Sequence, residues 1–484
     1  MTVFALILTP LLAAALSAVM PRAQQRFIEG VAVAATVLET LFCIAIITAV
    51  LRSGVVNASV FFQTDALGAF VAFFAALVGL AASIHAVSYL REEMRKGFIG
   101  FRRVRQHYVL FHLFLFAMFA AVTTGSPLLM WISIEATTLA TAFLITFYNK
   151  PSALEAGWKH LMINSVGLLL GFLGTLLFLN AAASAGATDP FISWGALRGI
   201  APSMNPILVT IAFIFVIVGF GTKVGFVPLH TWLPDAHSKA PIPISALLSG
   251  VLLNVALIAV LRFRGVTDGV LDPHFTQELL IGFGLVSVFV AAFMIFGQKN
   301  YKRMLAYSSI ENMGLLGIGF GVGGAATAYA LLHMLYHALF KALLFLSAGN
   351  FFLKYSSTKI AKIRGALTLV PVSATIFLAG LLALVGVPPS GIFFSKLGIL
   401  AAGMREFPYV MLLVLVAISI VFAGFMRHAS AMLFSEPAQD IPRGEIGDSN
   451  LASIVFLALV CAILSISMPA GLRELITQSA ALIR

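Results

Sequence analysis

Long apolar runs, separated by short polar stretches, recur along the whole chain. A helix of about 20 apolar residues spans the roughly 30 Å hydrocarbon core of a bilayer, and the runs have about that length. The first run is followed by polar residues rather than by a small-residue cleavage site, so we interpret it as a retained helix. The pattern predicts an all-α integral membrane protein with about fourteen transmembrane helices, over residues 3–20, 27–51, 66–89, 107–124, 127–148, 154–180, 206–230, 241–264, 277–297, 303–321, 325–350, 368–400, 409–428 and 450–468.

Two of these runs contain a lysine close to glycine and proline. Lys223 lies in Phe220-Gly-Thr-Lys-Val-Gly-Phe-Val-Pro228, and Lys396 closely follows Gly386-Val-Pro-Pro-Ser-Gly391. A charge at the centre of a bilayer costs at least about 2.5–3.5 kcal/mol. Broken helices can supply polar backbone groups and a hydrated cavity beside such a charge. The sequence therefore predicts two broken helices and a pathway for a small cation.

Ionisable residues inside the apolar runs recur at a nearly constant interval. We interpret this interval as two repeats of five helices, over residues 107–265 and 274–433, with helices 1 to 3 in residues 1–106 and an inner loop, the last helix and a short tail in residues 434–484. Because five is an odd number, the second repeat is inverted relative to the first, as in many transporters. Chance alignment of polar residues is the alternative. The intervals are 176, 174 and 173 positions for the pairs Glu135/Glu311, Lys159/His333 and Lys223/Lys396.

Composition narrows the class of protein further. Hydrophobic residues make up 60% of the 484 residues and charged residues 10%, which is more apolar than a soluble core requires. The net charge of +11 is explained by loop lysines and arginines, which orient membrane proteins, so we expect no nucleic-acid partner. Cys43 and Cys461 both lie in apolar runs, so we expect neither a disulfide framework nor an iron–sulfur cluster held by this chain.

Basic residues gather in loops on one side of the predicted bundle. The most basic loops lie in the ranges 91–105, 299–303 and 354–364. Because cytoplasmic loops of membrane proteins carry the excess of Lys and Arg, we expect these loops on the inner side. With an even number of helices, both termini then lie on the outer side of the cell's inner membrane.

Glu135 lies deep in the run 127–148, and no residue next to it in the sequence neutralises it. A buried carboxylate must be protonated or paired with a cation, and Lys223 is the natural partner. A lysine that is charged when paired and neutral when unpaired can take up and release one proton. Lys159 lies one turn into its run, so an interfacial anchor and a proton relay are both open for it.

Three titratable residues share one helix face. His333, His337 and Lys341 stand at positions i, i+4 and i+8. The two histidines have the spacing of a metal pair, but the glutamate of the H-E-x-x-H motif is missing and no third ligand is evident. A column of titratable groups inside a bundle suits proton hopping. Polar packing is the structural alternative.

Four motifs resemble a known family. They are Asp65-Ala-Leu-Gly68, the stretch from Lys223 to Pro243, Lys302-Arg-Met-Leu-Ala-Tyr-Ser-Ser-Ile310 and His337-Ala-Leu-Phe-Lys-Ala-Leu-Leu-Phe345. They look like the antiporter-like subunits of respiratory complex I, a family that includes Mrp-type cation/proton antiporters and membrane-bound nickel–iron hydrogenases. The similarity covers nearly the whole chain.

The resemblance implies a role for each candidate residue. Glu135 and Lys223 would form the pair of the first half-channel, and Lys396 would be the terminal lysine of the second. The central polar axis would hold Lys159, His333, His337 and Lys341, and His230, Glu311 and Asn254 are secondary candidates.

Within this family, three segments look most like the component F subunits of hydrogenase-4 and formate hydrogenlyase complexes: 134–139, 154–159 and 253–257. Asn254 stands where complex I members often carry a lysine, so the central relay would depend on Lys159 or on water. The chain also ends soon after its last apolar run, so we expect no long lateral helix at the C-terminus.

These observations predict a proton-translocating membrane subunit of a redox-driven complex, hydrogenase-4-like or NADH:quinone oxidoreductase-like. We expect no cofactor or metal in this chain, with nickel–iron and iron–sulfur centres, or flavin and quinone, in partner subunits. Its partners would be other membrane subunits and a peripheral electron-transfer arm. Sodium remains an alternative to the proton. A secondary cation/proton antiporter subunit, and a membrane scaffold or proton channel of an inorganic-carbon uptake complex, are the alternative functions.

The charge pattern gives a direct test of orientation. A cysteine introduced at position 98, within the basic loop 91–105, should react with a membrane-impermeant thiol reagent only from the cytoplasmic side. Labelling would be measured in intact cells and in inverted vesicles. Reaction in intact cells would reverse the predicted orientation and the direction of transport assigned to it.

Overall fold

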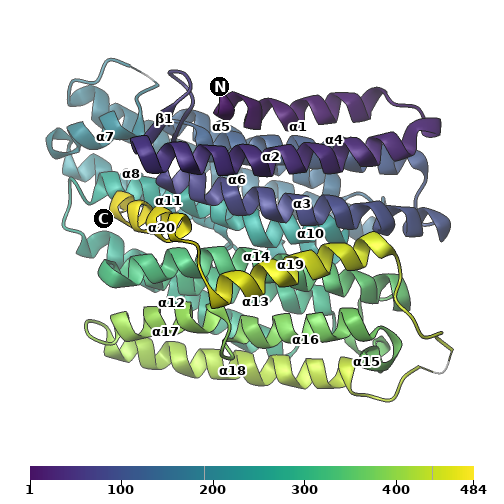
Figure 1. Cartoon of the computed structure of the whole chain (residues 1–484). Coiled ribbons are helices and arrows are strands. Elements are labelled where there is room, and N and C mark those ends of the chain that lie inside the picture. The colour runs from purple at the N-terminus through teal and green to yellow at the C-terminus, as the bar shows by residue number, and fades with distance from the viewer. Residues whose placement is uncertain (190, 439, 484) are drawn as a thin grey trace.

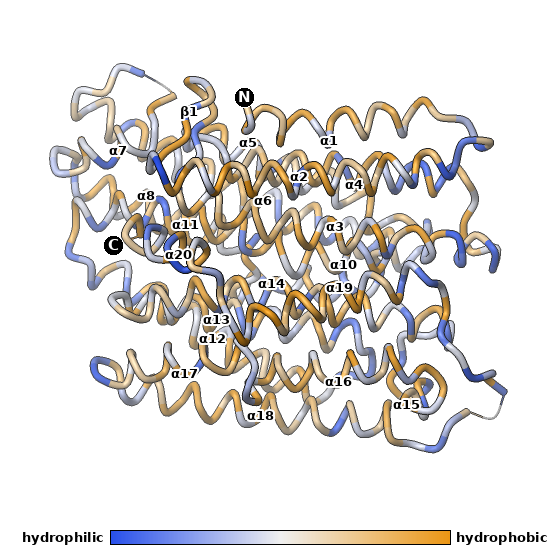
Figure 2. Tube along the Cα trace, in the orientation of Figure 1, coloured by the Kyte–Doolittle hydropathy of each residue, from blue (hydrophilic) through white to orange (hydrophobic). Residues whose placement is uncertain are grey.

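A computed structural model describes residues 1–189, 191–438 and 440–483 of the chain. Long helices lie side by side in one bundle, with α1 and α2 along one edge and α16 to α18 along the other (Figure 1). Hydrophobic positions cover the lengths of the helices, and hydrophilic positions gather in the connections at both ends of the bundle (Figure 2). The predicted all-α integral membrane class is confirmed.

The helices begin and end as follows: α1 (Thr2–Val19), α2 (Gln25–Ser53), α3 (Ala66–Arg95), α4 (Phe101–Thr123), α5 (Pro127–Ile145), α6 (Pro151–Ser184), α7 (Trp194–Ile200), α8 (Pro206–Val224), α9 (Trp232–Lys239), α10 (Ile242–Leu247), α11 (Leu253–Thr267), α12 (His274–Phe296), α13 (Tyr301–Val322), α14 (Gly324–Tyr355), α15 (Ala366–Leu369), α16 (Pro371–Val385), α17 (Gly391–Gly403), α18 (Pro408–Leu433), α19 (Asp448–Ile466) and α20 (Ala470–Ile483). Short 3-10 helices cover Arg22–Gln24, Ala201–Ser203 and Ile360–Lys362, and β1 (Val55–Asn57) pairs antiparallel with β2 (Gln63–Asp65).

Among the described residues, 12 helices are long and apolar enough to cross a membrane. The two remaining predicted runs correspond to α13, which carries several charged residues, and to the shorter pair α16 and α17. The total of fourteen transmembrane helices therefore stays a prediction, as does the division into two inverted repeats.

Both predicted breaks occur close to a glycine in the left-handed region. Gly225, with φ of 90°, ends α8, and α9 begins at Trp232. Gly386, with φ of 96°, ends α16, and α17 begins at Gly391. The lysines lie differently relative to these breaks, because Lys223 is in the last turn before its break while Lys396 follows its break inside α17.

The centre of the bundle is formed by two helices. Every residue is buried in the most apolar 18-residue stretch of Ile242–Thr267. In the corresponding stretch of α14, 94% of the residues are buried. The central segment contains a π-helical turn at Leu248–Leu252, between α10 and α11. Such turns occur mostly as single insertions in α-helices, often at functional sites. Here the turn lies against α14, since a Cβ on Gly250 would sit 2.6 Å from the Ala338 carbonyl oxygen.

An ion pair between partly buried Asp65 and buried Arg262 joins β2 to α11. Asp65 caps α3 by accepting from the Gly68 N–H at 2.9 Å, and its two carboxylate oxygens accept from Arg262 at 2.7 and 2.9 Å. Burial raises the pKa of the Asp65 carboxyl, but Arg262 and the Gly68 N–H outweigh burial and hold that pKa below its ordinary value.

Helices α6 and α8 approach each other closely where both carry glycine. A Cβ on Gly219 would lie 2.2 Å from the Gly171 backbone nitrogen. Because a membrane bundle depends on such packing, Gly219→Ala should lower the free energy of unfolding by about 1–3 kcal/mol. The midpoint of thermal unfolding in detergent measures this. Gly282→Ala on α12 is the matched control, since nothing lies within 4 Å of a Cβ there, and equal midpoints for the two variants would contradict the prediction.

Candidate functional site

The second broken helix carries a buried ion pair. The Lys396 ammonium on α17 lies 3.0 Å from a Glu311 carboxylate oxygen on α13, and both side chains are buried. The sequence interpretation placed both residues inside the membrane without pairing them. A buried pair of this kind costs desolvation, which its geometry has to offset.

His333 links this ion pair to α14. Its Nδ1 lies 2.9 Å from the Ser395 Oγ, next to Lys396 in sequence, and its Nε2 lies 3.0 Å from the Asn312 Oδ1. The Asn312 amide in turn donates to Glu311. The His333 imidazole therefore contacts both Ser395, next to Lys396, and Asn312, next to Glu311.

The three titratable residues of α14 form the expected column. The rings of His333 and His337 lie 6.4 Å apart, centroid to centroid, and are nearly parallel. Neither ring nitrogen of His337 has a hydrogen-bond partner among the described residues. Lys341 donates to the Ser308 hydroxyl at 2.6 Å and to the Leu305 carbonyl oxygen. All three side chains are fully buried.

The first broken helix is organised differently, and the expected direct contact between Glu135 and Lys223 is not formed in the described structure. Thr138, one turn from Glu135, lies between them: its hydroxyl accepts from Lys223 at 2.9 Å and lies 3.3 Å from the carboxylate of Glu135. Ser165 on α6 also donates to Glu135, at 3.0 Å. The pair is therefore bridged by a hydroxyl group rather than joined by a salt bridge.

His160 belongs to this first cluster, and our sequence interpretation missed it. Its Nε2 lies 2.9 Å from the Thr141 hydroxyl, and its ring packs 4.8 Å from the Trp232 ring. The Lys223 ammonium lies 5.8 Å from the same indole. The signal was present, because the interval of 173 positions that separates Lys223 from Lys396 also separates His160 from His333.

Lys159 lies elsewhere. Its side chain is 47% exposed and pairs with Glu155 at 2.6 Å and Asp235 at 3.5 Å. The turn of α6 that directs His160 inward directs Lys159 outward, because adjacent residues of a helix point in different directions. The structure thus places Lys159 in a surface ion-pair network, away from the central axis that the resemblance implied.

The remaining secondary candidates are His230 and Asn254. His230 lies in the break between α8 and α9, with its ring 6.3 Å from the Tyr307 ring. Asn254 is buried just after the π-helical turn, where its amide donates to the Gly250 carbonyl oxygen at 2.7 Å. Neither residue contacts Lys223 or Lys396 by a hydrogen bond in the described part of the chain.

The chemistry available here is proton transfer and charge pairing. No group of three or more His, Cys, Asp or Glu side chains within the described residues could hold a metal ion. Two clusters, each with a lysine, a glutamate and a histidine, instead flank broken helices in a multi-pass membrane bundle. These features define the class of ion-translocating membrane proteins.

Comparisons with known proteins identify the family. Residues 124–423 match the family of NADH:quinone oxidoreductase/Mrp antiporter transmembrane proteins, and the chain belongs to this family of antiporter-like membrane subunits. It is 36% identical over 384 residues to a hydrogenase-4 component F homolog of Methylacidiphilum infernorum, covering 78% of this chain and 80% of that one.

Two further proteins are similar to this chain. The chain is 29% identical over 414 residues to NADH-quinone oxidoreductase subunit N of Desulforudis audaxviator, covering 82% of this chain and 79% of the relative. A chain of the membrane-bound sulfane sulfur reductase, an archaeal respiratory membrane complex, shares the fold with a TM-score of 0.86 and 23% identity, covering 99% of this chain and 97% of the other. The expected family and its hydrogenase-4-like branch are thus confirmed.

The adjacent residues Lys159 and His160 give a matched test of the site. Because only His160 contacts the buried cluster, His160→Gln should slow proton transport by roughly tenfold or more, while Lys159→Gln should transport near the wild-type rate. Initial rates in sealed vesicles, at equal amounts of assembled protein, measure both. A slow Lys159→Gln variant beside a normal His160→Gln variant would return the relay role to Lys159.

Proposed function

We propose that this chain is the proton-translocating membrane subunit of a multi-subunit, redox-driven complex of the hydrogenase-4 type. The observation that carries the proposal is the buried ion pair of Lys396 and Glu311, joined through His333 to a column of titratable groups on α14. Buried ionisable residues in a membrane are expensive and mark ion pathways.

The transport step follows from pairing and burial. While Lys396 is paired with Glu311, the ammonium form is stabilised. If the pair opens, the ammonium loses its counter-charge in an environment that disfavours charge, and it releases a proton. His333, His337 and Lys341 lie on one face of α14 and supply a route by which the next proton arrives.

The first cluster would couple to the second through the same route. Lys223 has a hydroxyl partner rather than a direct carboxylate, so small movements of α5 or α8 change its interaction with Glu135. Moving one charge against 100 mV requires about 2.3 kcal/mol, a size that rearranging a few buried pairs can provide.

The energy would come from partner subunits. We assign electron transfer to a peripheral arm that carries nickel–iron and iron–sulfur centres, or flavin and quinone. We place the complex in the inner membrane with both termini of this chain outside, as the basic loops favour. A secondary cation/proton antiporter subunit is the second candidate, supported by the Mrp antiporters in the same family.

Variants of the first cluster test the proposal. Glu135→Gln and Lys223→Ala should each abolish proton translocation while the complex still assembles, because each removes the charge at one end of the bridge that Thr138 forms between them. Proton uptake would be measured in sealed vesicles driven by the electron donor of the complex. Glu155→Gln and Lys362→Ala, which change exposed residues of the same types, are the matched controls.

The outcomes separate the functions. Donor-dependent uptake that survives in both cluster variants would overturn the proposal. Transport that needs only an imposed cation gradient, with no electron donor, would assign the chain to the secondary antiporters instead.

A further inference from the structure

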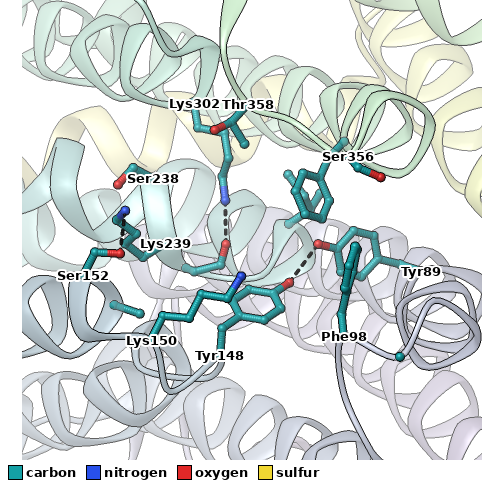
Figure 3. A pocket seen from close by; sticks show the side chains of 15 residues that line it. Tyr89, Phe98, Tyr148, Lys150, Ser152, Ser238, Lys239, Lys302, Ser356 and Thr358 are labelled. Atoms are coloured by element: carbon teal, nitrogen blue, oxygen red, sulfur yellow. Dashed lines mark hydrogen bonds between the residues drawn. The ribbon is translucent and has the colours of Figure 1, made fainter. Parts of the chain in front are cut away.

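A cavity of about 520 Å³ opens at the end of the bundle where the basic loops lie. It is lined by Gly97 and Phe98 of one such loop, by the start of α6, by the link between α9 and α10, and by the residues that follow α14. Figure 3 shows the Lys150 and Lys302 side chains extending into this cavity beside Tyr89 and Tyr148. Aqueous ions on this side of the protein could therefore reach the interior.

A buried carboxyl group lies behind the two tyrosines. Glu93, on α3, is fully buried, and its Oε1 accepts from the hydroxyls of Tyr89, at 3.1 Å, and Tyr148. The two hydroxyls are also 3.0 Å from each other. Its second oxygen, Oε2, has no hydrogen-bond partner in the described part of the chain. A buried carboxylate oxygen without a donor is costly unless the group is protonated for part of the time.

The surroundings of Glu93 balance its two protonation states. Burial favours the neutral acid, whereas the tyrosine hydroxyls and the positive charges of Lys302 and Lys150 favour the carboxylate. These groups come from α3, the connection from α5 to α6, and α13. A carboxyl group in such a balance can take up a proton and give it away again.

Buried polar residues lie between the cavity and Lys341 on α14. Lys302 is buried and donates to the Ala240 carbonyl oxygen. His237 is fully buried, within electrostatic range of both Lys302 and Lys341, and neither of its ring nitrogens has a partner in residues that the structure describes. Its ring stacks 4.8 Å from the Phe345 ring, and Lys341 lies 5.4 Å from that same ring.

We propose that Glu93 is the proton-uptake residue of this chain, and that Lys302 and His237 carry the proton from the cavity to Lys341. The inference rests on the proposed function and adds its point of entry. A hydronium ion in the cavity gives one proton to a tyrosine hydroxyl and leaves as water, while that hydroxyl passes its own proton to the Glu93 carboxylate. The carboxylic acid then protonates the neutral amine of Lys302, which passes the proton to His237 and returns to its neutral form.

Adjacent glutamates provide the test. Glu93→Gln should slow donor-driven proton uptake in sealed vesicles at least tenfold, because the amide cannot accept a proton. Glu92→Gln should transport at the wild-type rate, since Glu92 lies towards the surface and pairs with Arg95 at 2.7 Å. Glu93→Asp should recover part of the rate. An aspartate variant that assembles but is as slow as the glutamine variant would overturn the proposal.

A measurement on the unaltered complex avoids any effect on folding. A hydrophobic carbodiimide reacts with protonated carboxyl groups in apolar surroundings, so peptide mass spectrometry should find its adduct on Glu93 and not on Glu92. Labelling should fall as the pH on the basic-loop side rises. Absence of the adduct, or labelling that ignores this pH, would overturn the proposal.

The same vesicles separate this inference from the proposed function. If Glu93→Gln transports normally while Glu135→Gln does not, entry through Glu93 is wrong and proton translocation stands. If neither variant changes transport, both are wrong.

Discussion

The cost of burying charge in an apolar bundle determines much of this structure. A charge at membrane depth is costly unless it is paired, and in two ion pairs of this chain the partner comes from a different element. Lys396 reaches across from α17 to Glu311 on α13, and Asp65 reaches Arg262 on α11. Because breaking one member of such a pair leaves an uncompensated charge, the helices that carry them are held in register by electrostatics as well as by packing.

The close packing of the helices also brings polar partners to the buried charges. Glycines allow α6 and α8 to come close enough for Thr138, Ser165 and Lys223 to meet around Glu135. The two broken helices keep irregular backbone inside the protein, where a membrane bundle tolerates it. The polar interior is thus a product of close backbone contact, and not of loosely packed helices.

The sequence predicts most of the fold because membrane helices are encoded by one-dimensional patterns. Run length locates the helices, and glycine and proline locate both breaks. Lys396, His333, His337 and Lys341 were found because a charge in an apolar run is conspicuous. Side-chain direction is not encoded in that way, so the pattern did not separate the outward Lys159 from the inward His160.

Contacts between helices could not be predicted from the sequence either. Threonine is common in membrane helices, and nothing in the one-dimensional pattern marks Thr138 as the bridge between Glu135 and Lys223. Glu93 sits in the basic segment at the end of α3, where neighbouring charges make it look like a solvated residue. Only the packing of Tyr89 and Tyr148 over it shows that it is buried.

The two lysines lie at different positions along their half-helices. Lys223 is in the last turn of α8, next to carbonyl groups that carry the negative end of the helix dipole and favour a nearby cation. Lys396 lies in the second turn of α17, and its side chain also reaches Gly386 at the C-terminal end of α16, where a Cβ would lie 3.5 Å from the Lys396 Cδ. Both lysines therefore lie beside the C-terminal end of a half-helix, but Lys223 has a hydroxyl partner and Lys396 has a carboxylate partner. Because one lysine is held by a hydroxyl and the other by a carboxylate, the two halves of the bundle are alike in plan and different in their local chemistry.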